Sequence, residues 1–316
     1  MKRFWRLMTG LGLVGLLMGG FGCGRGGVAA DNRPQVVATA TMAADLVREI
    51  GGERVQVHGL MAAGVDPHSY TTRMSDVGLL EKADLIVYVG LHLEGAMHET
   101  LEEMGKRGKR TVALGESLAP ARLLAPEAGF VGHYDPHIWG DPTLWAETIP
   151  AVVAGLSAID PDGAAEYAAR GDAYAAKLRG LAEWAHQRIA EVPAQRRVLV
   201  TSHDAFFYFG RVFGFEVSGL QGLSTVAEAG VRDRLVLVEL IKSRGLRTIF
   251  PESSVNAKGI EAVALEAGAA LSSQPLYSDS MGMPGDVVTV AGESYDRGTY
   301  IGMLKHNVNT IVEGLK

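Results

Sequence analysis

Cysteine is nearly missing from this sequence, because Cys23 is the only one in 316 residues. One cysteine cannot form an internal disulfide, so the fold cannot depend on one. The sequence also lacks any run of lysine and arginine, and its formal net charge is −6. Phosphate contacts need basic patches, and this absence therefore argues against a nucleic-acid partner.

The apolar stretch near the start of the chain is short for a membrane span, which needs about 20 apolar residues. In residues 1–23, Lys2, Arg3 and Arg6 precede an apolar stretch that begins at Leu7. This order predicts a signal peptide for export that is removed from the mature chain; an uncleaved N-terminal anchor helix is the alternative. Removal changes the net charge from −6 to −9, because the segment carries three basic residues and no acids.

Cys23 ends this segment in the sequence "GFGC". The sequence resembles a bacterial lipobox, the motif whose cysteine is lipid-modified and becomes the mature N-terminus. It departs from the usual pattern, because Gly20 stands where leucine is typical. We expect an exported protein, periplasmic or at the cell surface, with a lipid anchor at Cys23 and a flexible tether over residues 24–34.

Residues 35–159 alternate between strand and helix patterns. A β-rich run at 34–42 and a buried-strand run at 84–90 are separated by helical stretches, and glycine follows several of them. One of these stretches, 75–83, is expected to be a short helix with Ser75 as its N-cap. Strands that alternate with helices and glycine turns predict a parallel α/β lobe.

Residues 160–193 interrupt this alternation with a segment rich in alanine, leucine, glutamate and arginine. Its large side chains recur near helical spacing: Tyr167, Tyr174, Leu178, Leu181 and Ile189. A flexible linker would be rich in glycine, serine or proline instead. We therefore predict one long, rigid helix, roughly 45 Å long at 1.5 Å per residue.

The α/β alternation returns in residues 194–316. A strand ends near Ser202, an amphipathic helix ends at Gly245, a strand is expected over 271–277, and a helix ends the chain. The predicted fold class is therefore α/β, with two parallel-sheet lobes (35–159 and 194–316) joined by the helix 160–193.

Three of the nine histidines occupy special positions. His68 and His137 each follow an Asp-Pro pair, and His203 follows the predicted strand "RVLVTS". Ligands of open α/β sheets bind outside the carboxyl ends of strands, so the two lobes would present these side chains to a shared cleft. The other histidines are expected at the surface, in packing between helices or, for His133, near the cleft mouth: 58, 92, 98, 133, 186 and 306.

Three neutral imidazoles in a cleft predict a metal site. Imidazole suits zinc, copper, iron and nickel, and also manganese when oxygen ligands join it. One carboxylate would complete a set of four ligands, and the candidates are Asp279 in "LYSDSMG" and Glu252 in "FPESS". Ligands this far apart in the chain carry no local spacing signal.

Several stretches together resemble the solute-binding lipoproteins of ABC importers for zinc and manganese. They occur in the family's order along nearly the whole mature chain: "GVDPHSYTTRMSDVGLLEKADLIVYVGLHLE", "DPHIWGDP", "TSHDAFFYFGRVFGFEVSGLQGLSTVAEAG", "IFPESS" and "LYSDSMG". The resemblance implies two α/β lobes joined by a long helix, with the metal between the lobes.

Carried over motif by motif, the resemblance implies His68, His137, His203 and Asp279 as the metal ligands. Glu252 would then lie behind the ligands and orient them. The implied partner is a membrane permease driven by a cytoplasmic ATPase, and the protein is expected to be a monomer.

The sequence departs from the family in features that bear on the metal. The long loop rich in histidine and acids that many zinc members carry before the second histidine is absent, and many manganese members have glutamate at the position of His203. Three imidazoles and one carboxylate suit tetrahedral zinc, so Zn²⁺ is favoured, with Mn²⁺ close behind.

Two other functions remain open at this stage. Without Asp279 as a ligand, the three histidines would leave an open position, as in a zinc hydrolase with Glu252 as base. No HExxH motif occurs in the sequence. A surface adhesin lipoprotein is the second alternative.

Overall fold

The computed structural model describes residues 32–125, 134–290 and 292–316. The predicted signal peptide 1–23 with Cys23, most of the predicted tether 24–34, and His133 lie outside the described residues. Those predictions therefore remain predictions from the sequence.

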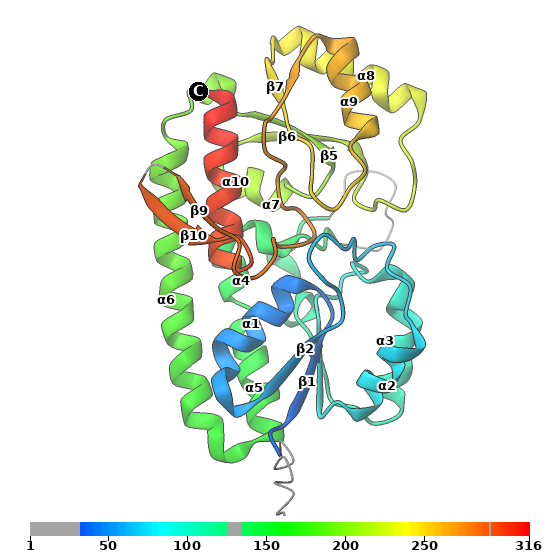
Figure 1. The fold of residues 1–316 in the computed structure, drawn as a ribbon, viewed down its shortest axis with the longest axis vertical. Helices are drawn as coiled ribbons and strands as arrows, with labels where there is room; N and C mark the ends of the chain where they lie inside the picture. Colours follow the sequence, from blue (N-terminus) through cyan, green and yellow to red (C-terminus); the bar gives the residue numbers. More distant parts are fainter. Residues whose placement is uncertain (1–31, 126–133, 291) are drawn as a thin grey trace, which may run out of the picture. The chain divides into compact units, whose positions relative to one another are not determined.

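The first half of the described chain is built on a parallel sheet with strand order β2-β1-β3-β4 (Figure 1). Its strands are β1 (Gln35–Ala38), β2 (Gln56–Gly59), β3 (Leu85–Tyr88) and β4 (Thr111–Ala113). Its helices are α1 (Thr41–Gly51), α2 (Met74–Lys82), α3 (His98–Lys106), α4 (Pro142–Ala146) and α5 (Ile149–Ile159).

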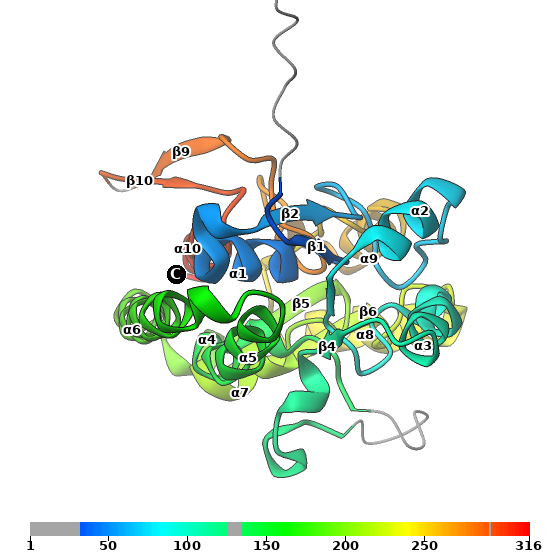
Figure 2. The same cartoon turned by 90° about the horizontal axis from the view of Figure 1, so that it is seen from below.

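Helices cover both faces of this sheet, which explains why its central strands are continuous apolar runs. In β1, Val36 packs into the core cluster that contains residues of α1 and α5, whereas Val37 packs into a second cluster with residues of α2 and α3. Figure 2 shows the two helix groups on opposite sides of β1. The predicted parallel α/β lobe is confirmed.

The long helix α6 (Ala164–Ile189) has 26 residues and follows a 3₁₀ turn over Pro161–Gly163. At 1.5 Å per residue it is about 39 Å long. Its buried stripe contains the five large residues that the sequence placed at helical spacing. Gly171 lies where α6 packs on α5, because a Cβ there would lie 2.9 Å from Ile149 Cγ2. The helix is confirmed, with ends a few residues inside the predicted range.

The second half contains the parallel pairs β5-β6 and β7-β8. A parallel bridge between Thr201 and Phe250 links the two pairs. The strands are β5 (Val198–His203), β6 (Glu216–Gln221), β7 (Thr248–Ile249) and β8 (Ala270–Leu271). The helices are α7 (Phe207–Phe213), α8 (Val231–Arg244), α9 (Lys258–Ala267) and α10 (Tyr300–Leu315).

Two local predictions were wrong. Helix α2 begins at Met74, and its capping carboxylate is Asp76, which accepts the Arg73 N–H at 2.8 Å, so Ser75 is not the N-cap. The strand predicted over 271–277 ends at Leu271, because Ser272 begins a turn and Pro275 has no N–H to donate to a ladder. An antiparallel hairpin of β9 (Val287–Val290) and β10 (Glu293–Asp296) was not predicted.

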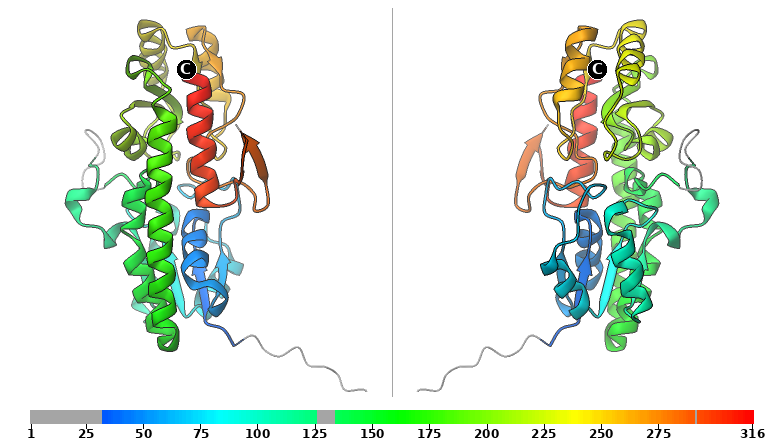
Figure 3. Two further views of the ribbon diagram at one scale, coloured as in Figure 1. Left: turned by 90° about the vertical axis from the view of Figure 1, so that its left-hand side faces the viewer. Right: turned by 90° about the vertical axis from the view of Figure 1, so that its right-hand side faces the viewer.

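One hydrophobic core extends through both halves. The cluster that contains Val36 of β1 also contains Tyr174 of α6, Phe250 after β7 and Ile311 of α10. Helices α6 and α10 lie side by side along it (Figure 3). The predicted pair of lobes joined by a long helix therefore shares a core, and this common core holds the carboxyl ends of the two sheets in place. The predicted boundaries at 35–159, 160–193 and 194–316 stay predictions.

Candidate metal centre

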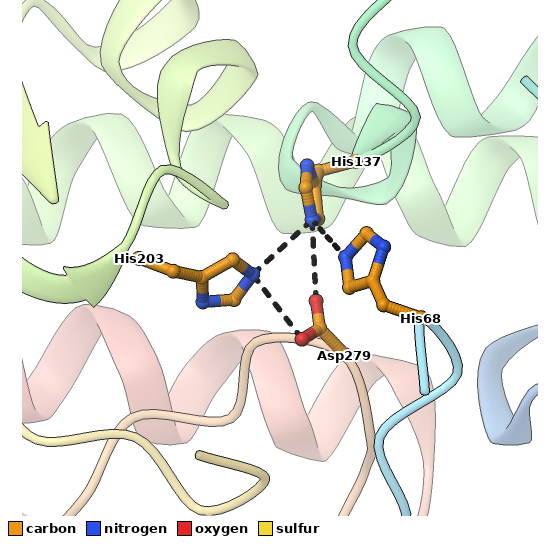
Figure 4. A group of neighbouring side chains, drawn as sticks. All are labelled: His68, His137, His203 and Asp279. Atoms are coloured by element: carbon orange, nitrogen blue, oxygen red, sulfur yellow. Dashed lines mark hydrogen bonds and ion pairs between the residues drawn. The ribbon is translucent and has the colours of Figure 1, made fainter. Parts of the chain in front are cut away.

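Four predicted ligands meet in the interior between the two sheets. His68 follows β2, His137 precedes the 3₁₀ turn Ile138–Gly140, His203 is the last residue of β5, and Asp279 lies between β8 and β9. Their side chains point toward one another (Figure 4). Each of the four is at most 4% exposed, so water does not compete for their polar atoms.

The spacing of their polar atoms fits a single small cation. His137 Nε2 lies 3.3 Å from His68 Nε2, from His203 Nε2 and from Asp279 Oδ1. All four ligand atoms lie within 4.8 Å of one another. A tetrahedron with metal–ligand bonds of 2.0–2.1 Å has edges of about 3.3–3.4 Å. The three separations from His137 Nε2 therefore match the edges of a tetrahedral zinc site, and the remaining pairs lie within 4.8 Å.

The two Asp-Pro-His motifs form the same backbone bend. In each one the aspartate Oδ1 accepts the backbone N–H of the histidine two residues later, at 2.9 Å for the Asp66–His68 pair and 2.9 Å for the Asp135–His137 pair. The proline between them keeps the aspartate extended. The repeated motif thus presents each histidine from a rigid loop.

Carboxylates behind two of the predicted ligands fix their tautomers. His137 Nδ1 lies 2.7 Å from Asp135 Oδ1, and His203 Nδ1 lies 2.5 Å from Glu252 Oε2. Since these ring nitrogens donate, the opposite nitrogen of each neutral ring keeps its lone pair for a metal. The prediction that Glu252 lies behind the ligands agrees with this geometry, whereas the sequence reasoning missed the same role of Asp135.

Asp279 is the member of the cluster with a buried carboxylate oxygen that lacks a hydrogen bond. Its buried Oδ1 makes no hydrogen bond among the described residues, since His137 Nε2, 3.3 Å away, can donate to it only when that ring is protonated, and Ser254 Oγ reaches Oδ2 only at 3.5 Å. A buried carboxylate oxygen without a donor is costly unless a cation compensates it. The side chains present therefore fit a bound divalent ion.

The pKa shifts show what replaces that ion when it is absent. Burial lowers the pKa of His68 to about 4, although Asp279 opposes the shift. Burial also lowers the pKa of His137, but Asp135 and Asp279 together outweigh it and raise the pKa to about 9. The pKa of His203 is raised well above its usual value, since Asp279 and Glu252 outweigh burial.

The pKa of Asp279 moves in the opposite direction. Burial raises it, but His203 and His137 outweigh burial and hold the pKa well below the usual value. Asp279 therefore favours the ionised form, and its charge in turn favours protonation of His137 and His203 in the metal-free protein. A metal ion has to displace those protons.

Trp139 supports the site from the core. Its indole N–H donates to Ser278 O at 2.8 Å, next to Asp279, and its ring centroid lies 5.3 Å from that of His137. It is buried, and the sequence reasoning missed its contacts to the segments that carry two of the predicted ligands. Its place two residues after His137 was the available signal.

The other histidines in the described ranges do not join the cluster. His92 and His98 stack on each other at the surface, with ring centroids 4.8 Å apart. Glu94, between them in sequence, is buried and accepts N–H groups of Val89 and Gly90. His186 packs against Phe213, and His306 Nε2 lies 2.9 Å from Pro275 O.

The chain is similar to known metal-binding proteins over almost its whole length. The profile of the family described as "Zinc-uptake complex component A periplasmic" matches residues 36–314. The manganese-binding lipoprotein MntA of Bacillus subtilis is 41% identical over 301 residues, covering 93% of this chain and 94% of the relative. The zinc-binding protein TroA of Treponema pallidum is 41% identical over 297 residues, which cover 91% of this chain and 90% of the relative. The solved structure of that TroA superposes with a TM-score of 0.83, covering 90% of this chain and 99% of TroA.

Proposed function

The chain belongs to the family of periplasmic zinc-uptake components, and on that premise we propose that His68, His137, His203 and Asp279 hold the ion that it transports. The protein is a metal-binding solute-binding protein of an ABC importer for zinc or manganese, and it works outside the cytoplasm. The hydrolase and adhesin alternatives gain no support from its relatives.

The observation that carries this assignment is the convergence of four buried ligand atoms within 4.8 Å of one another, three of them at the 3.3 Å spacing of a tetrahedral site from His137 Nε2. Three imidazoles and a carboxylate occupy all four positions of such a site. A catalytic zinc keeps one position for water, so a filled site suits capture and release rather than hydrolysis. We therefore propose that the loaded protein has no hydrolytic turnover.

We propose zinc as the preferred ion, with manganese next. Nitrogen-rich, four-coordinate sites favour zinc in both geometry and stability order. Manganese prefers more oxygen ligands, and Asp279 offers a second one, because its Oδ2 lies 3.2 Å from His203 Nε2. The same carboxylate can thus bind through one oxygen to zinc or through both to manganese.

Delivery follows from membership in this family. A solute-binding protein of an ABC importer hands its ion to a membrane permease. We further propose that Cys23 carries a lipid anchor and that the protein acts as a monomer. The shared core along α6 and α10 limits hinge motion, so opening of the site is expected to involve loops of the second half.

Competition titrations of Zn²⁺ and Mn²⁺ against a chelator, on metal-stripped protein, test the ligand set. Structural zinc sites bind with about 10–16 kcal/mol, so one of four ligands is worth roughly 100- to 1,000-fold in affinity. We expect His68→Ala and Asp279→Asn each to weaken zinc binding by about this factor. His98→Ala and Asp172→Asn, at exposed positions, are the matched controls. Unchanged affinity in Asp279→Asn would remove Asp279 from the site.

A further inference from the structure

Strand β5 presents side chains to two different layers of the second half. Leu199 packs into the core shared with α6, whereas Val200 packs into the cluster with residues of α8 and α9. Side chains alternate along a strand. His203 therefore points toward the metal centre, and Ser202 points toward the α8–α9 layer.

A hollow of about 580 Å³ lies where Ser202 points. Its lining includes Gly230 and Val231 at the start of α8, and Asn256 and Lys258 at the start of α9. Its position at the carboxyl end of parallel strands is where α/β sheets bind ligands. Volumes of about 300–1,000 Å³ are typical of small-molecule sites.

Two donors in the wall of this hollow have no acceptor within the described ranges. Ser202 is 2% exposed, and its Oγ is buried without a hydrogen-bond partner. Arg234 Nε is also buried and unpaired, although its guanidinium lies 3.4 Å from Glu266. Buried donors are almost always satisfied in native proteins, so these two point to an absent acceptor.

The surrounding charge favours an anion. The 14-residue α8 and the 10-residue α9 both begin at the hollow, and helix N-termini carry a partial positive charge. Lys258 adds a positive charge, and no carboxylate among the described residues forms an ion pair with it.

Two acidic residues, Asp66 and Glu228, also line the hollow, but neither accepts a hydrogen bond from Ser202 Oγ or Arg234 Nε. Asp66 already accepts the His68 N–H, the Ser69 hydroxyl and the Thr225 hydroxyl. Glu228 is exposed. The buried groups of the wall that lack a hydrogen-bond partner are therefore donors.

We propose that this hollow is a second ligand site, which takes a phosphate-class oxyanion, either free or as the headgroup of a small organic phosphate. The oxyanion accepts from Ser202 Oγ, from Arg234 Nε and from N–H groups in the first turns of α8 and α9, with Gly259 rather than Lys258 as the donor of α9 because Asn256 Oδ1 already accepts the Lys258 N–H. The remaining space, beside Leu220, Val231 and Ile260, has room for an organic substituent.

The test is a titration of the metal-stripped protein with inorganic phosphate and with glycerol 3-phosphate, followed by calorimetry and by amide NMR shifts. We expect saturable binding with shifts at Ser202, Val231 and Gly259. Tighter binding of glycerol 3-phosphate identifies an organic phosphate as the ligand class, and equal binding identifies the free oxyanion. If neither compound binds up to millimolar concentrations, the proposal is wrong.

Lys258→Gln and Lys242→Gln form a matched pair, because both remove one exposed positive charge and only Lys258 lines the hollow. Lys258→Gln is expected to weaken phosphate binding at least about five-fold, while Lys242→Gln leaves it unchanged. Equal loss in both variants would show general charge attraction and overturn the site. Ser202→Ala should weaken binding without lowering the unfolding temperature, since its Oγ has no internal partner.

Discussion

Glu252 holds His203 through both of its carboxylate oxygens, although the two residues are 49 positions apart. Oε1 accepts the backbone N–H of His203 at 2.8 Å, and Oε2 accepts its Nδ1–H at 2.5 Å. The first bond fixes the end of β5, and the second fixes the ring and its tautomer. One buried carboxylate thus connects the sheet to the metal centre.

Replacing Glu252 by glutamine is expected to weaken zinc binding by about 10- to 100-fold, the range typical of groups behind metal ligands. The amide nitrogen of glutamine faces one of the two N–H donors of His203, so one hydrogen bond is lost together with the negative charge. Chelator competition measures the change. Glu239→Gln, at an exposed position on α8, is the control, and equal affinities in both variants would contradict the role of Glu252.

Zinc affinity is expected to fall steeply as the pH falls from 8 to 5. The pKa of His137 is raised to about 9 and that of His203 lies well above its usual value, so both rings favour the protonated form before metal binds, and increasingly so as the pH falls. His68, with a pKa lowered to about 4, is already neutral. Binding should therefore release about two protons, and affinity should change by about a hundredfold per pH unit.

Calorimetry in buffers of different ionisation enthalpy counts the released protons. A count near zero at pH 7, or an affinity that is flat from pH 7.5 to 5, would mean that these imidazoles are not the ligands. His98→Ala should show the same count as the unmodified protein, because its ring lies outside the cluster.

Thr225→Val is expected to speed zinc dissociation by about 3- to 10-fold. Thr225 Oγ1 donates to Asp66 Oδ2 at 2.6 Å and so ties a loop of the second half to the segment that carries His68. Valine keeps the shape and removes this bond, which is worth about 1 kcal/mol at a partly exposed site. Stopped-flow dissociation into excess chelator measures the rate. Thr289→Val, on the exposed hairpin, should leave it unchanged.

Asp45→Asn is expected to stabilise the metal-free protein at pH 8. Burial raises the pKa of Asp45 to about 6 from its usual 3.8, with Tyr300 and Tyr174 opposing the shift. The folded state thus prefers the protonated form, and its free energy of unfolding decreases as the pH rises from about 4 through 6. The loss above pH 6 is at most about 3 kcal/mol.

Urea unfolding at pH 4 and pH 8 separates this effect from a packing change. The variant should match the unmodified protein at pH 4 and exceed it by about 1–3 kcal/mol at pH 8. Lower stability at pH 8 would mean that the ionised carboxylate is favourable where it lies. Asp172→Asn on the exposed side of α6 should change neither value.

The elements with strong local signals were predictable. The long helix follows from its buried stripe, and the end of α8 follows from Gly245, which adopts the left-handed conformation with φ 60°. The hairpin β9–β10 was missed because its strands are four residues each and partly exposed, so their alternation is too short to stand out. Ser75 was mistaken for a cap because the nearby Asp76 makes the bond instead.

The ligand assignments rested on a different kind of signal, and they remain predictions. Strand ends and the Asp-Pro-His bends indicated three histidines, but the choice of Asp279 over Glu252 rested on resemblance to a family. The structure gives the physical difference between them: Glu252 accepts the backbone N–H and the Nδ1–H of His203, whereas Asp279 Oδ1 makes no hydrogen bond among the described residues and faces the predicted ligand nitrogen of His137 at 3.3 Å. Such a distinction depends on contacts between distant segments, which local patterns do not contain.

Anomalous diffraction at the zinc edge from crystals of the zinc-loaded protein locates the bound ion directly. We expect one strong peak within about 2.0–2.2 Å of His68 Nε2, His137 Nε2, His203 Nε2 and an oxygen of Asp279. A peak bound by the three histidines and a water, with Asp279 turned away, would contradict this expectation and point back to an open zinc site.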